Sequence, residues 1–288
     1  MDSQPSLGII GGSGLYNMAG LEDIQEHDLE TPYGRTSAPI VTGSLSGKRV
    51  AFLARHGIGH HISPSEIPFR ANIYALKSLG VEQIVSISAS GSLREDYAPG
   101  DMVIPDQLFD FTRGRKGTFF EEGLVAHINV AGPFCPRLSQ QLLQATQNTG
   151  TNVHFGGAFI TVEGPRFSTK AESHTYRAWG MSIIGMTTSP EAFLAREAEL
   201  CYAVLAHVTD YDVWHTDEAP VTVEMVIQIL NKNPLIAQQA INNLVVTFQD
   251  KRECECPNAL ASAFITKQER IPPDTRKKLS IFVDKYLA

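Results

Sequence analysis

Two aspartates, Asp210 and Asp212, have residue types and a spacing that could do chemistry. They flank Tyr211 and follow the apolar segment 201–208 after a single threonine. A continuous apolar run bounded by polar residues is typical of a buried strand in a parallel sheet, and ligands bind just beyond the carboxyl ends of such strands. The two carboxylates could donate a proton to a leaving group, or they could be solvated turn residues. The residues at the other strand ends must decide between these interpretations.

A glycine-rich segment, Gly11-Gly12-Ser13-Gly14, follows the first predicted strand, residues 7–10. Glycines let backbone amides approach an anion closely, and the Ser13 hydroxyl adds a donor. The dinucleotide pattern G-x-G-x-x-G is not met, because position 17 is Asn, and no Lys-Ser/Thr pair completes a Walker motif. Taken alone, this segment predicts a tight structural turn about as well as a phosphate site.

Basic residues follow the next predicted strand, residues 50–54, in the order Arg55, His56, His60 and His61. A guanidinium forms bidentate charge-assisted bonds with phosphate, and imidazole adds a further donor. Three histidines this close could also bind zinc. However, glycines separate His56 from His60, and no carboxylate stands beside them as in H-E-x-x-H. The segment therefore favours an anion over a metal, with a solvated loop as the alternative.

Two more strand ends carry small hydroxyl residues. A predicted strand at 84–88 ends in Ser88 and is followed by a predicted turn at 89–92. A predicted strand at 182–186 leads into Thr187 and a helix whose N-terminal amides and dipole favour an anion. Each segment is weak evidence alone, but several anion-compatible strand ends beside a pair of carboxylates make a much less accidental pattern.

The elements that would position these residues alternate between strands and helices, which indicates an α/β fold. Thr169 and Glu172 match a capping box that opens a helix to Trp179, and Ser189 with Pro190 opens another. The remaining expected elements are a helix over 68–79 that ends at Gly80, a strand at 102–104 and a mainly helical region from residue 222.

The composition limits the function. The chain has 288 residues, a formal net charge of −7 and 43% hydrophobic residues, which suits a soluble globular protein. The acidic balance argues against binding to nucleic acid. No apolar run reaches the roughly 18 residues of a membrane span, and residues 1–6 lack the features of a signal peptide. We therefore expect a cytoplasmic protein with neither nucleic acid nor membrane as a partner.

Four cysteines in this length do not make a disulfide framework. Cys135 and Cys201 are expected to be buried thiols. Cys254 and Cys256 form a C-x-C sequence that could be a redox pair or two incidental reduced thiols. Two cysteines without further ligands make a weak zinc site, so no metal is expected.

Six segments together resemble the trimeric purine nucleoside phosphorylase family, and specifically its 5′-methylthioadenosine phosphorylase branch. The resemblance runs from about residue 7 to 245. It implies one domain over 1–288 with a central mixed, largely parallel β-sheet flanked by helices, and residues 250–288 as a helical C-terminal extension. The segments are Gly11-Gly12-Ser13-Gly14-Leu15, Ala54-Arg55-His56-Gly57, Ala89-Ser90-Gly91-Ser92-Leu93, Val162-Glu163-Gly164-Pro165-Arg166-Phe167-Ser168, Met186-Thr187-Thr188-Ser189-Pro190-Glu191 and Thr209-Asp210-Tyr211-Asp212-Val213-Trp214.

The resemblance assigns roles to the matching residues. It implies that Asp210 faces the purine N7 as general acid and that Asp212 lies near the exocyclic amine. A His from a neighbouring subunit of the implied homotrimer reaches the 5′ pocket, and His127 matches its position. Inorganic phosphate is implied to bind Ser13, Arg55, His56, His60, Ser88, Ala89 and Thr187. The nucleoside is implied to bind Met186, Phe167 and Ser168, with its 5′ substituent against Val223, Val226 and Ile227.

The reaction implied is phosphorolysis of S-methyl-5′-thioadenosine to adenine and 5-methylthioribose 1-phosphate, with phosphate as co-substrate and no cofactor. In the 6-oxopurine phosphorylases of the family, Glu and Asn occupy the positions of Ser168 and Asp210, so adenine is favoured here. Two alternatives are a methylthioinosine or broader purine nucleoside phosphorylase, and a non-catalytic nucleoside- or phosphate-binding protein on the same fold. The C-terminal extension is expected to add a helix that covers a subunit edge or an active site.

Overall fold

The computed structural model describes residues 4–11, 18–215 and 234–287. Its strands are β1 (Leu7–Gly11), β2 (Glu22–His27), β3 (Glu30–Thr31), β4 (Gly34–Arg35), β5 (Ile40–Leu45), β6 (Lys48–Ala54), β7 (Gln83–Ser92), β8 (Met102–Ile104), β9 (Gln107–Phe111), β10 (Val153–Phe155), β11 (Ala158–Val162), β12 (Ile183–Gly185) and β13 (Cys201–Asp210). Its helices are α1 (Phe69–Ser78), α2 (Pro136–Gln147), α3 (Lys170–Ala178), α4 (Thr188–Glu197), α6 (Pro234–Thr247), α7 (Pro273–Lys278) and α8 (Ser280–Val283), with 3₁₀ turns η1 (Cys256–Asn258) and η2 (Gln268–Arg270).

The large sheet has parallel strands at its centre. Its main path runs β10-β8-β13-β7-β1-β6-β5-β2, and β12, β11 and β9 branch from β7, while β3 and β4 pair separately. β1 pairs in parallel with β6 and β7, and β13 pairs in parallel with β7. β5, β8 and β12 are antiparallel to their neighbours β6, β13 and β7. The predicted mixed, largely parallel sheet is therefore confirmed, and the carboxyl ends of β1, β6, β7 and β13 share one edge.

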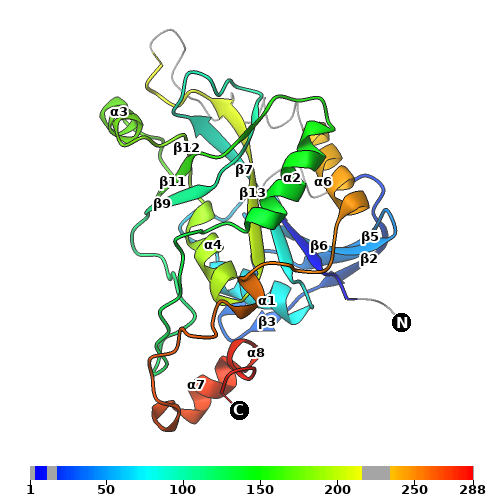
Figure 1. Ribbon diagram of the computed structural model, residues 1–288, viewed down its shortest axis with the longest axis vertical. Coiled ribbons are helices and arrows are strands. Elements are labelled where there is room, and N and C mark those ends of the chain that lie inside the picture. The colour runs from blue at the N-terminus through cyan, green and yellow to red at the C-terminus, as the bar shows by residue number, and fades with distance from the viewer. Residues whose placement is uncertain (1–3, 12–17, 216–233, 288) are drawn as a thin grey trace.

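Both faces of the sheet are covered by helices, as the apolar strand at 201–208 predicts. All ten residues of β13 are buried. Tyr202 and Val204 pack into the core that includes α1 and α4, whereas Cys201 and Ala203 pack into the core that includes α2 and α6. The alternation follows from the two-residue period of a strand. Figure 1 shows α2 and α6 together on one side of the sheet.

Local signals in the sequence predicted several boundaries correctly. The capping box is present, because the Thr169 hydroxyl accepts from Glu172 N and the Glu172 carboxylate accepts from Thr169 N. Gly80 follows α1 with φ +93°, a conformation that glycine adopts at little cost. Ser189 is extended, so the regular part of α4 begins at Pro190, as expected.

The turn predicted at 89–92 is wrong. β7 continues through Ser92, because β12 pairs antiparallel with this part of the strand and supplies hydrogen bonds that sequence patterning does not reveal. Likewise β13 runs to Asp210, opposite Gly91, after an irregularity in the register. The hydroxyl-rich segment 89–92 is therefore part of a paired strand and not an open loop.

The chain after residue 249 forms short helical segments rather than one amphipathic helix. Leu279, Phe282 and Val283 pack into the same core as α1 and α4, and α7 and α8 lie at one end of the molecule (Figure 1). Among the described residues, no helix combines the length and apolar character needed to cross a membrane.

Candidate active site

The two aspartates lie at the end of β13, where the backbone holds them close together. The Asp210 carboxylate accepts from the Thr209 hydroxyl (2.6 Å) and from the Asp212 backbone N–H (2.7 Å). Asp212 has φ +51°, which turns the chain back towards Asp210. Opposite them, a Cβ atom on Gly91 would lie 3.0 Å from Asp210 Oδ1. The absence of a side chain at Gly91 thus leaves room for the carboxylate of Asp210.

Asp212 is buried in an environment that favours its neutral form. Burial raises the pKa of its carboxyl, and the charge of Asp210 raises it further, while the hydroxyls of Ser173 and Ser168 act in the opposite direction. Its Oδ2 atom has no hydrogen-bond partner among the described residues. A buried polar atom without a partner is costly unless a ligand or water satisfies it, so Asp212 is suited to bind a polar ligand group.

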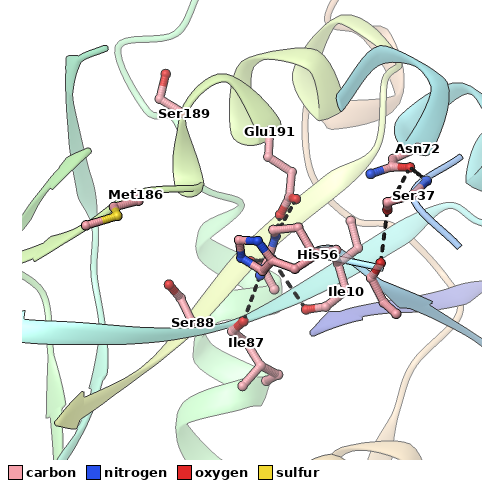
Figure 2. Close-up of polar contacts among 12 residues, drawn as sticks. Ile10, Ser37, His56, Asn72, Ile87, Ser88, Met186, Ser189 and Glu191 are labelled. Atoms are coloured by element: carbon pink, nitrogen blue, oxygen red, sulfur yellow. Dashed lines mark hydrogen bonds and ion pairs between the residues drawn. The ribbon is translucent and has the colours of Figure 1, made fainter. Parts of the chain in front are cut away.

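Arg55, at the end of β6, forms a buried ion pair that the sequence did not reveal. Its Nε and Nη2 donate to the two carboxylate oxygens of Glu191 at 2.8 and 2.9 Å, and the two side chains are 2% and 1% exposed. Further donors reach Ile87 O (3.1 Å) and Ser86 Oγ (2.6 Å), and Tyr202 donates to Glu191 (2.7 Å). Figure 2 shows Glu191 directed from α4 towards the sheet. The sequence places Glu191 after the helix start at Ser189-Pro190 and in one of the segments that resemble the family, but neither observation indicates its pairing with Arg55.

His56 and His60 stack with ring centroids 4.1 Å apart. Burial lowers the pKa of His56 to about 4, and burial also lowers the pKa of His60. The His56 Nδ1 lies 2.9 Å from Ile62 O, so the neutral ring donates there and leaves Nε2 for another partner. Both rings are therefore neutral near pH 7, and an anion beside them would favour protonation.

Ser88 and Ala89 lie on β7 alongside β13, opposite Ala206 and His207. The end of β12 meets them, because a Cβ on Gly185 would lie 3.5 Å from Ala89 O. Met186 and Thr187 follow Gly185 directly, and Thr187 is buried. Four predicted residues, two within β7 and two directly after β12, are thereby brought to one region, and Figure 2 shows Ser88 and Met186 on these two segments.

Arg115, which sequence reasoning missed, joins the segments at the ends of β11 and β12. Its Nη1 donates to Met186 O (2.7 Å) and Ser189 O (2.8 Å), and its Nη2 donates to Glu163 O (2.7 Å). The side chain is 3% exposed. A Cβ on Gly164 would lie 2.5 Å from Met186 Sδ, so the two segments also pack directly. No local pattern around Arg115 signals this role.

The remaining predicted residues are placed as follows. Phe167 is 37% exposed and Ser168 is half-buried, both just before α3. His127 is exposed, and its backbone N–H donates to Ala263 O (2.8 Å) rather than to a strand end of the site. Four predicted site residues lie outside the described residues, namely Ser13, Val223, Val226 and Ile227, as does the first part of the helical region predicted from residue 222.

The fold and the polar groups at its strand ends define an enzyme of the phosphorylase superfamily. The chain matches this superfamily over residues 6–245 and belongs to it. Within the superfamily it falls in the S-methyl-5′-thioadenosine phosphorylase branch. A protein of this name from Koribacter versatilis is 49% identical over 283 residues, covering 98% of this chain and 97% of the relative. Another from Chloroflexus aurantiacus is 51% identical over 282 residues, covering 98% of each.

Solved structures give the same assignment. A methylthioadenosine phosphorylase from an Antarctic soil metagenomic library has a TM-score of 0.93 at 47% identity, covering 97% of this chain and 99% of that one. A mutant adenosine/methylthioadenosine phosphorylase from Schistosoma mansoni, in complex with methylthioadenosine, has a TM-score of 0.83 at 36% identity, covering 90% and 96%.

Proposed function

We propose that the protein cleaves S-methyl-5′-thioadenosine with inorganic phosphate, giving adenine and 5-methylthioribose 1-phosphate. The observation that carries this proposal is the placement of Asp210 and Asp212 at the same sheet edge as the polar ends of β6 and β7. The similarity to proteins named for methylthioadenosine phosphorolysis supports it.

Asp210 delivers a proton to the purine N7 as the glycosidic bond lengthens, because a neutral base is a better leaving group. The Asp212 backbone N–H holds the Asp210 carboxyl in place at the end of β13, and Asp210 must carry this proton when the nucleoside is bound. A phosphate oxygen then forms a bond to the sugar C1′ from the opposite face and neutralises its developing positive charge. We propose no metal or organic cofactor for this step.

The phosphate is held at the ends of β6, β7 and β12. His56 and His60 supply imidazoles whose protonation the anion itself promotes, and Ser88 and Thr187 supply hydroxyls. Arg55 is also assigned to the phosphate site, and because Glu191 compensates its charge while Ser86 and Ile87 accept from it, it acts mainly by fixing the end of β6 against β7. Ala89 supplies its backbone amide. Ser13, which lies outside the described residues, is assigned a further hydroxyl donor.

The base is held by Phe167, Ser168 and Asp212, and the ribosyl group by Met186. Asp212 in its charged form accepts from a 6-amino group, which favours adenine. Its raised pKa supports a second candidate activity, because a protonated Asp212 donates to a 6-oxo group. Methylthioinosine is therefore the most informative competing substrate, and its use should rise as the pH falls.

We assign the 5′ pocket to Val223, Val226 and Ile227 on the family resemblance alone, with His127 contributed by a neighbouring copy. The exposure of His127 supports a role outside its own subunit. The assembly is a homotrimer, so light scattering on the purified protein should give three times the chain mass of 31.5 kDa. A monomer would remove His127 from the site. The protein acts in the cytoplasm.

The activity is tested by chromatographic measurement of base release with and without phosphate. S-methyl-5′-thioadenosine should be cleaved only when phosphate is present, and adenosine, methylthioinosine and inosine should be cleaved more slowly. Asp210→Asn should lower kcat by about 10²–10⁴-fold while the affinity for phosphate is retained. Asp96→Asn is the matched control, because it makes the same chemical change at an exposed ion pair. Nucleoside binding without base release from any of the four substrates would point instead to a non-catalytic binding protein.

A further inference from the structure

The four cysteines of the chain converge on one place in the fold. Cys135 directly precedes α2 and Cys201 begins β13, while Cys254 and Cys256 lie on the segment after α6. Their sulfur atoms all lie within 4.8 Å of one another, and the Sγ atoms of Cys201 and Cys254 are 3.4 Å apart. All four are unbridged thiols. In the sequence alone, the C-x-C pair lacked further ligands for zinc. The fold brings Cys135 and Cys201 beside this pair, so four potential ligands meet.

This spacing suits a tetrahedral metal site. Zinc binds thiolates at about 2.3 Å, which places the four sulfurs of a tetrahedron about 3.8 Å apart. A disulfide joins each sulfur to one partner and requires only pairwise proximity. Here every sulfur lies near the other three, so closing on a central ion requires only small movements.

The surroundings also favour thiolates. Arg196 Nη1 donates to Cys256 Sγ at 3.3 Å, which places a cation beside the cluster. Cys135 stands at the N-terminus of α2, where the helix dipole favours negative charge. Cys135, Cys201 and Cys256 are buried, whereas Cys254 is partly exposed and gives an ion a route in.

We propose that Cys135, Cys201, Cys254 and Cys256 bind one Zn²⁺ ion as a structural site. Four protein ligands leave no open position for substrate or water, so the ion stabilises the fold and takes no part in phosphorolysis. Each thiol that binds loses a proton, so zinc affinity falls as the pH is lowered.

The site fastens the C-terminal segment to the core. From Cys256 the chain leads to a pairing between Ala126 and Phe264, next to the hydrogen bond from His127 N to Ala263 O. Removing the ion should therefore loosen the 250–266 segment and the loop that carries His127, and should lower the Tm by several degrees.

The test is metal content, which is independent of catalytic activity. Full-length protein is purified with a phosphine reductant, loaded with zinc, desalted and measured by elemental analysis. We expect one zinc per chain in the wild type and in His61→Ala, a control for binding by the exposed histidine loop. Cys135→Ser and Cys256→Ser should each lose at least nine-tenths of the zinc.

If a cysteine variant does not fold, cobalt in the wild-type protein gives the answer. Tetrahedral thiolate ligation produces intense sulfur-to-cobalt charge-transfer bands together with visible d–d bands. Three outcomes would overturn the proposal. In the first, the protein contains no zinc after loading and all four thiols can still be titrated. In the second, both cysteine variants retain zinc. In the third, the protein is reduced and then given zinc, and mass spectrometry shows that disulfides form again among these cysteines.

Discussion

Replacing Glu191 by Gln tests whether the buried ion pair with Arg55 holds the phosphate end of the site together. The substitution preserves size and shape but removes the negative charge that compensates a guanidinium only 2% exposed at its side chain. It also weakens the bond from Tyr202, which donates to Glu191 at 2.7 Å. A buried cation left without its partner is strongly destabilising.

The magnitude follows from this burial. Removing one partner of a buried pair costs about 3–5 kcal/mol of folding free energy, and for a domain of this size each 1 kcal/mol lowers the Tm by about 2–4 °C. Glu191→Gln should therefore lower the Tm by about 6–20 °C. Asp96→Asn, which breaks the exposed Arg94–Asp96 pair with side chains 44% and 60% exposed, should cost less than about 1 kcal/mol.

Equilibrium urea unfolding measures both variants, and the apparent KM for phosphate serves as a second readout. A double replacement, Arg55→Met with Glu191→Met, should recover part of the stability lost in Glu191→Gln, since it leaves no uncompensated charge. A loss in Glu191→Gln no larger than that in Asp96→Asn would refute the reasoning.

The remaining predictions concern base selection, the pH dependence of stability and the N-cap of α3. Asp212→Asn should favour methylthioinosine over S-methyl-5′-thioadenosine, because the new amide can donate to a 6-oxo group. The ratio of the two kcat/KM values should rise by about tenfold or more. An unchanged ratio would show that Asp212 does not select the base. Burial raises the pKa of Glu197 to about 7 from 4.5. Its contribution to stability is therefore full below pH 4.5 and is lost as the pH rises through 7. Glu197→Gln should flatten the dependence of Tm on pH between these values, and the same slope in the wild type and the variant would contradict this prediction. Thr169→Ala removes the cap of α3 and should cost about 1 kcal/mol, measured by urea unfolding, with Thr169→Ser as the control that keeps the hydroxyl.

Much of the fold could be predicted because local chemistry determines it. The apolar run that became β13, the capping box at Thr169 and the glycine after α1 each act over a few residues. The route of β7 through Ser92 could not be predicted, because its partner β12 lies far along the chain and the polar composition is typical of a turn. The pairing order that makes the sheet mixed came from the family resemblance rather than from periodicity.

The candidate site shows the same division. Asp210 and the strand-end groups could be identified because parallel strands bring their carboxyl ends to one edge. The partners of those groups could not, since the Arg55–Glu191 pair, the reach of Arg115 and the meeting of four cysteines all depend on tertiary packing. The neighbouring sequence around a charged or thiol side chain does not reveal whether that side chain will contact water or another buried residue.

Arg115 has a consequence for how the site recognises its substrate. One buried guanidinium binds the backbone of both the segment that leads to Phe167 and the segment that carries Met186. The surfaces that we propose to receive the purine and the sugar are therefore fixed relative to each other when the protein folds, and substrate binding need not order them separately. An effort to redesign the base specificity by exchanging residues 163–168 should keep Arg115 and the carbonyl it binds at Glu163, because a grafted loop without that anchor would present its new contacts to the wrong position of the sugar.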